Sequence, residues 1–174
     1  MLTFRPAAPA DVPAVVRLVE SAYRGEGSKR GWTTEADLLG GQRTDADAVA
    51  EMIAARGSRV ELGFDAAGTL AACVRLKEES DGSLYVGLLA VDPARQAGGL
   101  GKELLARAEA VARERSLRRL RMTVISARAE LLAFYERRGY ARTGRTEPFP
   151  EHDPRFGLPK VRGLVFVELA KPLA

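Results

Sequence analysis

A glycine-rich turn follows a run of apolar residues near the middle of the chain. Residues 88–102 read LLAVDPARQAGGLGK, so a buried strand leads through glycines into a helix. Glycine allows a backbone to approach a phosphate closely. The first turn of a helix offers unpaired N–H groups and the positive end of the helix dipole. The segment therefore predicts a site for a pyrophosphate group.

Two common phosphate motifs do not fit this turn. The dinucleotide fingerprint requires a glycine where Leu104 stands. The Walker pattern requires glycine where Gln96 stands, and Ser or Thr where Glu103 stands. The pattern that fits is Arg or Gln, two residues, Gly, one residue, then Gly or Ala, which is met by Gln96, Gly99 and Gly101.

This six-residue pattern resembles the one found in the GNAT superfamily of acetyl-CoA-dependent N-acetyltransferases. A second segment, FYERRGY at residues 134–140, is similar to the family's Leu-Tyr-Glu-Lys-x-Gly-Phe. The spacing of the two segments and the order of predicted elements also match, over essentially the whole chain. The resemblance implies an enzyme that moves an acetyl group from acetyl-CoA to a primary amine of an unidentified acceptor. It further implies direct attack in a ternary complex.

The resemblance also implies which residues hold acetyl-CoA. The backbone of Leu89, Ala90 and Val91 would part from the next strand, hold the pantetheine arm and direct an N–H at the thioester carbonyl. Such a donor is worth roughly 3 kcal/mol in the transition state. The pyrophosphate would lie on Gln96, Ala97, Gly98, Gly99, Leu100, Gly101 and Lys102. Arg128 stands where the family often has Asn, so it would contact the cofactor differently or face solvent.

Tyr135 matches the family tyrosine that protonates the leaving thiolate. A phenol with a pKa of about 10 can donate to a thiolate whose conjugate acid has a pKa near 8.5. Taken without the family match, Tyr135 reads as a core aromatic residue of a short helix, and the resemblance reverses this reading. The general base stays open. Tyr85 occupies the strand position where some members have a glutamate base. The remaining candidates for the general base are a water relay, Glu79 and Glu147.

Two long segments, 24–43 and 146–162, fit no periodic pattern and are predicted to be loops that set acceptor specificity. Candidate acceptor-binding residues are the aromatic Trp32, Tyr85 and Phe149. The acidic first half of the chain, with Asp37, Asp45 and Asp47, suggests a cationic acceptor, either a small molecule or a peptide. His152 reads as a histidine of a surface loop.

Hydrophobic periodicity predicts the elements that must position these residues. Strands are expected at 2–5, 60–64, 70–77, 84–91, 120–124, 140–145 and 164–169. Helices are expected from 11 to about 25 and at 44–57, 99–115 and 129–138. Antiparallel neighbours are followed by a strand–helix–strand crossover, which must be parallel. The prediction is one mixed α/β domain, residues 1–174, whose mostly antiparallel sheet of about seven strands carries helices on both faces.

Composition excludes several other classes of protein. The 174 residues are 46% hydrophobic and 29% charged, which is typical of a folded domain. The chain has one cysteine, Cys73, and one histidine, so internal disulfides and a Cys/His zinc site are excluded, and no metal is expected. Cys73 reads as a buried, inert thiol, which disfavours a covalent intermediate. The start shows no secretory signal and no apolar run spans a bilayer, so we expect a cytoplasmic protein without a membrane partner.

Charge is unevenly distributed and leaves two alternatives open. Residues 95–145 hold 13 Lys or Arg against 5 Asp or Glu, within a net charge of +4 for the chain. The arginine-rich stretch 107–121 could bind nucleic acid, although no nucleic-acid-binding motif accompanies it and no such partner is expected. The missing strand glutamate would also suit a catalytically silent module that binds acyl-CoA. An edge strand, such as the last one, could pair across a homodimer.

Overall fold

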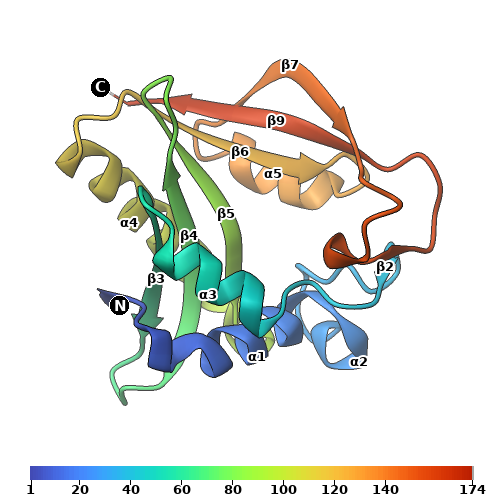
Figure 1. The fold of residues 1–174 in the computed structure, drawn as a ribbon, viewed down its shortest axis with the longest axis horizontal. Helices are drawn as coiled ribbons and strands as arrows, with labels where there is room; N and C mark the ends of the chain where they lie inside the picture. Colours follow the sequence, from blue (N-terminus) through green and yellow to red (C-terminus); the bar gives the residue numbers. More distant parts are fainter. Residues whose placement is uncertain (174) are drawn as a thin grey trace.

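The computed structural model describes residues 1–173 and has the predicted mixed architecture (Figure 1). The strands are β1 Thr3–Pro6, β2 Leu39–Gly40, β3 Ser58–Phe64, β4 Leu70–Glu78, β5 Ser83–Val91, β6 Arg119–Ile125, β7 Ala141–Pro148, β8 Leu158–Pro159 and β9 Val165–Pro172. The α-helices are α1 Val12–Tyr23, α2 Gly25–Ser28, α3 Ala46–Ala54, α4 Leu100–Glu114 and α5 Ala129–Glu136. Short 3-10 turns lie at Pro9–Asp11, Pro93–Gly98 and Pro154–Phe156.

Seven of the strands form one sheet in the order β1-β3-β4-β5-β6-β9-β7. Only β5 and β6 run parallel, because α4 connects them as a crossover. The other neighbouring pairs are antiparallel. The predicted fold class is therefore confirmed.

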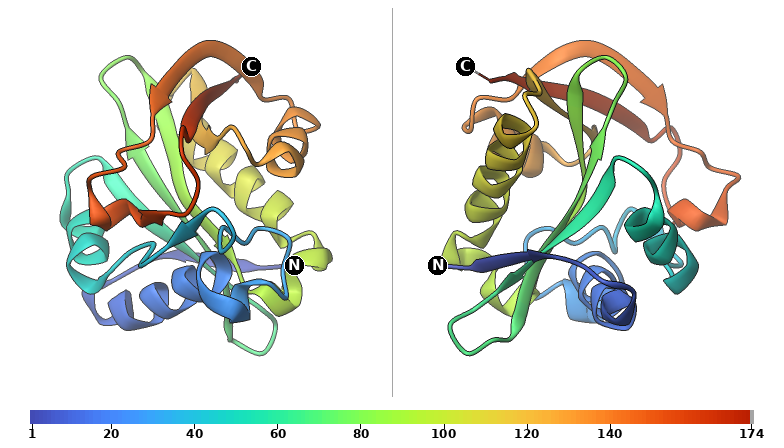
Figure 2. Two further views of the ribbon diagram at one scale, coloured as in Figure 1. Left: turned by 90° about the vertical axis from the view of Figure 1, so that its right-hand side faces the viewer. Right: turned by 60° about the vertical axis from the view of Figure 1, so that its left-hand side comes forward.

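Helices cover both faces of this sheet, with α4 on one side and α1 and α3 on the other (Figure 2). The inward side chains of α4 and α5, such as Leu104 and Leu132, pack with β4, β5, β6 and β9 in one apolar core. Those of α1 and α3, such as Val15 and Val49, pack with β3, β4 and β5 in a second core. The central strands are thus packed on both faces, with one core on each side.

The parallel strands β5 and β6 stay together only at their beginning. Ser83, Leu84 and Tyr85 pair with β6, and beyond Tyr85 the two strands part. The β4–β5 register also shifts near Arg75, and Leu88 has a φ of +48°. A positive φ is uncommon for leucine and is typical of a β-bulge that redirects a strand. The bulge therefore leaves the β6-facing edge of β5 unpaired from Val86 onward.

Three local predictions were wrong. The last strand, β9, is internal between β6 and β7, because the loop before it returns the chain to the middle of the sheet. The edges are β1 and β7, and β7 runs on through Pro148 into the segment 146–162 that was expected to be a loop. Asp45, not Thr44, caps α3, since its carboxylate accepts a 2.8 Å hydrogen bond from the N–H of Ala48.

The two long loops meet each other. Leu39 and Gly40 pair with Pro159 and Leu158 as the two-stranded ladder β2–β8. A third apolar cluster underlies this contact and contains Leu39, Ile125, Phe149 and Leu164. The loops therefore form one lid-like layer beside the diverging ends of β5 and β6 (Figure 1). None of the helices in residues 1–173 has the length and apolar character needed to cross a membrane.

Candidate active site

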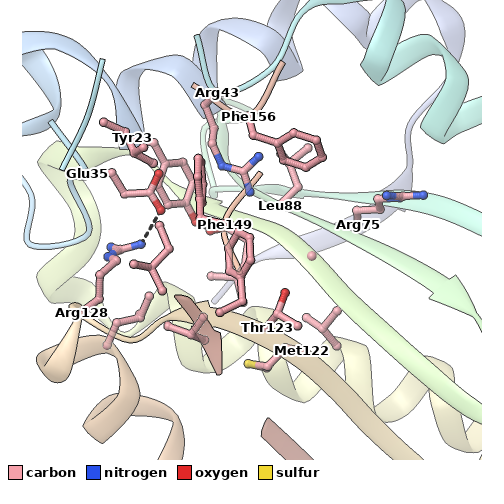
Figure 3. A pocket seen from close by; sticks show the side chains of 18 of the residues that line it. Tyr23, Glu35, Arg43, Arg75, Leu88, Met122, Thr123, Arg128, Phe149 and Phe156 are labelled. Carbon is pink, nitrogen blue, oxygen red and sulfur yellow. Dashed lines mark hydrogen bonds and ion pairs between the residues drawn. The ribbon is translucent and has the colours of Figure 1, made fainter. Parts of the chain in front are cut away.

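A cavity of about 320 Å³ lies where β5 and β6 part. Its walls come from β5, β6, the start of α5, the end of α1 and both long loops (Figure 3). The floor is apolar, with Leu88, Met122 and Val124 among its residues. Ligand sites in proteins combine such apolar walls with a few polar groups. A smaller pocket lies next to it against the glycine turn.

The glycine turn presents open backbone to solvent. Gly99 has a φ of +79° and is the N-cap of the 15-residue helix α4. A Cβ added at Gly98 or Gly99 would meet no atom within 4 Å. A Cβ at Gly101, by contrast, would stand 3.2 Å from the ring of Phe134. The turn therefore has room for a ligand at Gly98 and Gly99, in front of the free N–H groups of the helix.

The side chain of Gln96 hydrogen-bonds to other parts of the protein and does not extend into open space. Its Oε1 accepts hydrogen bonds from the N–H of Trp32 and Thr33, at 2.8 and 3.2 Å. Its Nε2 donates to Thr33 Oγ1 and to the carbonyl of Val91. Gln96 therefore anchors the first long loop to the turn. Ala97 and Lys102 are exposed beside it, Leu100 packs partly on the core, and Lys102 lines the smaller pocket.

Tyr135 lies between the two pockets. Its side chain lines both of them, together with Tyr23, Leu89 and Leu131. The residue is 5% exposed, and its ring lies edge-on to Phe134 at 5.3 Å between centroids. Burial raises the pKa of the Tyr135 phenol well above its usual value. The hydroxyl is therefore protonated at neutral pH and can act as a proton donor.

The bulge in β5 is tied to α1 by one hydrogen bond. The hydroxyl of Tyr23, at the end of α1, donates to the carbonyl oxygen of Leu89. This bond fixes the orientation of the peptides at the bulge. Leu89 lines both pockets, Val91 lines the smaller one, and Ala90 is buried between them in the strand. The unpaired edge of β5 is thus held still next to Tyr135.

Three buried charges join the loops to α5. The carboxylate of Glu35 accepts from Arg24 and, at 2.9 Å, from Arg128. Arg128 also donates to the carbonyl of Thr33, and Arg24 donates to that of Phe156. Burial alone would raise the pKa of Glu35, but the neighbouring guanidinium groups outweigh burial and hold the pKa below its usual value.

Of the two expectations for Arg128, the structure contradicts the one in which it faces solvent. Its side chain is 7% exposed, so it does not face solvent. Its guanidinium lines the larger cavity and holds the first long loop through Glu35 and Thr33 (Figure 3).

The three aromatic candidates divide between the pockets. Tyr85 and Phe149 line the larger cavity. The Tyr85 hydroxyl shares a 2.9 Å hydrogen bond with Thr123, and the Phe149 ring is buried against Phe166. Trp32 lines the smaller pocket instead, with its ring 5.2 Å from that of Phe134. The structure thus places Trp32 beside the glycine turn and leaves Tyr85 and Phe149 in the larger cavity.

The two carboxylates considered as bases also separate. Glu147, on the edge strand β7, lines the larger cavity. Glu79 lies outside it and is bound by Arg121 at 2.6 and 2.7 Å. The hydrogen bonds from Arg121 hold the pKa of Glu79 below its usual value. A carboxylate occupied in this way is poorly suited to accept a proton from an amine.

The acidic residues that suggested a cationic acceptor lie outside the larger cavity. Asp45 caps α3, and Asp37 is 84% exposed near Lys29. Asp47 is exposed in the first turn of α3. His152 lies in the surface loop between β7 and β9, as expected. Cys73 is fully buried, and burial raises the pKa of its thiol to about 12.

Ion pairs account for most of the basic stretch 107–121. Five of its arginines form ion pairs with carboxylates, and four of these carboxylates belong to the acidic first half of the chain. The pairs are Arg107–Glu61, Arg113–Glu109, Arg115–Glu78, Arg119–Asp81 and Arg121–Glu79. The charge asymmetry of the sequence is therefore largely neutralised within the fold, and it gives no support to nucleic-acid binding.

Sequence reasoning missed Tyr23, Glu35, Arg43 and Arg75, all of which line the larger cavity. Tyr23 reads as one more apolar position of α1, and the other three sit in a loop or on a strand without a motif. No signal in one sequence separates them from ordinary surface residues. Only the long loop 24–43, predicted to shape the acceptor site, pointed toward Glu35 and Arg43.

Comparison with known proteins identifies the family. The family model for the acetyltransferase (GNAT) family matches residues 29–140. No curated protein sequence matches the chain significantly. Similar solved structures include a candidate phosphinothricin N-acetyltransferase, with 18% identity, a TM-score of 0.74, and coverage of 100% of this chain and 99% of that one.

Two further structures are similar over almost all of both chains. One is the ribosomal-protein-alanine N-acetyltransferase from Brucella melitensis, with 20% identity, a TM-score of 0.71, and coverage of 99% of this chain and 100% of that one. The other is a candidate acetyltransferase from Salmonella typhimurium solved with acetyl-CoA, with 19% identity, a TM-score of 0.69, and coverage of 100% and 95%. At these identities the structures establish the fold, whereas the family model covers well over half of the sequence. The chain therefore belongs to the GNAT acetyltransferase family.

Proposed function

We propose that this protein is an N-acetyltransferase that moves the acetyl group of acetyl-CoA to a primary amine by direct attack in a ternary complex. The observation that carries the proposal is the position of Tyr135. It stands between a pocket at the glycine turn and a larger cavity. A proton donor at that junction is suited to act between a bound cofactor on one side and an acceptor on the other.

The residues present fit acetyl-CoA. Open backbone at Gly98 and Gly99, at the start of α4, suits the pyrophosphate, and the exposed ammonium of Lys102 adds positive charge there. The unpaired edge of β5 at Leu89 offers peptide groups for the pantetheine arm. When bound, acetyl-CoA supplies an activated acetyl group and a thiolate leaving group.

The chain's own residues then supply orientation and proton transfer. Tyr23 holds the Leu89 peptide, so that the edge of β5 is fixed before any ligand arrives. Tyr135 donates its phenolic proton to the departing sulfur. Glu147, either directly or through water, accepts the proton that the amine loses. Of the two carboxylates considered, it is the one that lines the cavity. Cys73 is buried, with a raised thiol pKa, and takes no part.

The test is release of free thiol from acetyl-CoA with a panel of amines, using wild type and Tyr135→Phe. The panel covers amino acids, polyamines, aminoglycosides and peptide N-termini. We expect turnover with one class and a fall in kcat of about 100-fold or more in the variant, the usual scale for a general acid. Tyr140→Phe is the matched control, because Tyr140 is an equally buried tyrosine that lines neither pocket. Calorimetric binding of acetyl-CoA without turnover on any amine would instead identify a silent acyl-CoA-binding module.

A further inference from the structure

The larger cavity carries more positive than negative charge. Four arginines and two glutamates line it: Arg24, Arg43, Arg75, Arg128, Glu35 and Glu147. Glu35 is shared by Arg24 and Arg128, which are 5% and 7% exposed. Arg43 and Arg75 have no Asp or Glu within ion-pair distance anywhere in residues 1–173. Arg75 Nε donates to Ser58 Oγ at 3.4 Å, and its guanidinium extends away from Arg43 (Figure 3). Arg43 is therefore the cation best placed to meet a ligand in the cavity.

Arg43 is well placed to meet a ligand. The N–H groups of Arg43 and Thr44 both donate to the Glu20 carboxylate, at 2.6 and 2.7 Å, which fixes the backbone of the loop there. The Arg43 guanidinium lies 5.4 Å from the centre of the Tyr23 ring, and its side chain extends among those lining the cavity (Figure 3). Arg43 makes no direct ion pair, although its charge helps to lower the pKa of the nearby Glu35 carboxylate, which Arg24 and Arg128 already bind. An anionic ligand group would give the Arg43 guanidinium a direct partner.

Tyr23 places this cation near the reacting centre. The Arg43 guanidinium lies over the Tyr23 ring, and the Tyr23 hydroxyl donates to the carbonyl of Leu89 on the bulge. The ring of one tyrosine thus spans the gap between Arg43 and the edge of β5 where the acetyl group is expected. A small molecule can bridge the same gap, with its amine toward Leu89 and Tyr135 and its other end toward Arg43.

We propose that the acceptor is a small amine that also carries an anionic group, a carboxylate or phosphonate, and that Arg43 binds this group. The inference rests on the proposed function, since it names the class of amine that is acetylated. Guanidinium groups match the geometry of carboxylate and phosphonate oxygens. Glu147 supplies negative charge for the ammonium end. The cavity charge thus argues against the cationic acceptor that the acidic first half of the chain suggested.

The test compares acceptors that differ only in charge. β-Alanine, 2-aminoethylphosphonate, β-alaninamide and 1,3-diaminopropane have similar length, and L-methionine with L-methioninamide adds an apolar side chain. With saturating acetyl-CoA, we expect kcat/KM for an acid to exceed that of its amide by about tenfold or more, the scale of a charge-assisted hydrogen bond. Calorimetric titration of the CoA-bound protein with the same acids and amides should show the same order.

Variants assign the preference to a residue. Arg43→Gln should reduce the acid-over-amide ratio about tenfold through KM, and Arg43→Lys should restore part of it. Arg43→Met, which keeps a side chain of similar length without charge, should reduce the ratio as well and provides a second test if Arg43→Gln does not fold. Arg56→Gln is the matched control, since Arg56 is exposed and lines none of the pockets described above. It should keep the full ratio.

The outcomes separate the inference from the proposed function. Equal or better acetylation of the amides or the diamine would overturn the inference and leave acetyl transfer intact. The inference would also be overturned if Arg43→Gln weakened acetyl-CoA binding and left the acid-over-amide ratio unchanged, because Arg43 would then bind the cofactor. No transfer to any amine despite cofactor binding would contradict the proposed function, and the inference would fall with it.

Discussion

The guanidinium of Arg128 donates a 2.9 Å hydrogen bond to the carboxylate of Glu35, across 93 residues of sequence. The bond joins the first long loop to the start of α5, which also carries Tyr135. Glu35 takes a second guanidinium from Arg24 on its other oxygen. One buried carboxylate thus holds together the acceptor side of the cavity.

Replacing Glu35 by glutamine should destabilise the protein strongly. The change leaves two buried arginines without a counter-charge, and breaking a buried ion pair from one side costs about 3–5 kcal/mol. Urea unfolding of Glu35→Gln and wild type measures the difference. Glu26→Gln is the control, because Glu26 is 87% exposed and its pair with Lys29 contributes little. A loss no larger than that of the control would show that the cluster does not support the fold.

The Glu35 carboxylate should make the free energy of unfolding depend on pH. The folded pKa of Glu35 lies below the usual value of 4.5, so its stabilising contribution is complete above that value and is lost as the pH falls below it. Urea midpoints at about pH 6 and about pH 4 should therefore differ more for wild type than for Glu35→Gln. Identical pH dependence in the two proteins would contradict the lowered pKa.

The pH–rate profile should show no falling alkaline limb from Tyr135. Burial raises the pKa of this phenol above its usual value of 10.0, so it keeps its proton throughout the range in which an amine becomes deprotonated. Tyr135→Phe should lower kcat at every pH without changing the shape of the profile. A limb near pH 9 that is present in wild type and absent in the variant would show that the phenol ionises in the working range.

Gly98→Ala should weaken acetyl-CoA binding while leaving the fold intact. Its added Cβ meets no protein atom within 4 Å, and the φ of Gly98 is not positive, so the unfolding free energy should change little. The methyl group would occupy the space in front of the turn where the pyrophosphate is expected, and we expect KM for acetyl-CoA to rise about tenfold or more. Gly27→Ala, another glycine with open space around it, is the control. Unchanged KM in Gly98→Ala would move the pyrophosphate away from this turn.

Glu147→Gln should slow the reaction and Glu79→Gln should not. Glu147 lines the cavity, whereas Glu79 lies outside it, bound to Arg121. For a carboxylate that accepts the amine proton, we expect a fall in kcat/KM of about 100-fold, less at alkaline pH where the free amine predominates. Equal rates for the two variants would point to a water relay held by other groups.

The fold could be predicted closely from the sequence because its signals are local. Alternation in β3 and β6, helical spacing in α1 and α4, and the glycines around α4 each specify one element. The place of β9 could not be read in this way, since strand order depends on which neighbour a returning strand meets. Nor could the end of β7, because all of its residues are exposed and carry no apolar alternation.

The residues of the site likewise fall into those that a local motif predicts and those that only the fold brings together. The motif brought out the glycine turn and Tyr135, whose roles depend on residues near them in sequence. The charges of the acceptor cavity come from residues far apart, such as Arg43, Arg75 and Glu35. Only the folded chain brings these together, and only then does the excess of positive charge emerge.

The most direct measurement of the central claim uses acetyl-CoA with a deuterated acetyl group and an amino-acid acceptor. Mass spectrometry of the acceptor after incubation with wild-type protein should show one labelled acetyl group on the amine nitrogen. Formation of that product should fall about 100-fold in Tyr135→Phe and stay unchanged in Tyr140→Phe. Free CoA without a labelled acceptor, or equal labelling by wild type and Tyr135→Phe, would contradict acetyl transfer with Tyr135 as its acid.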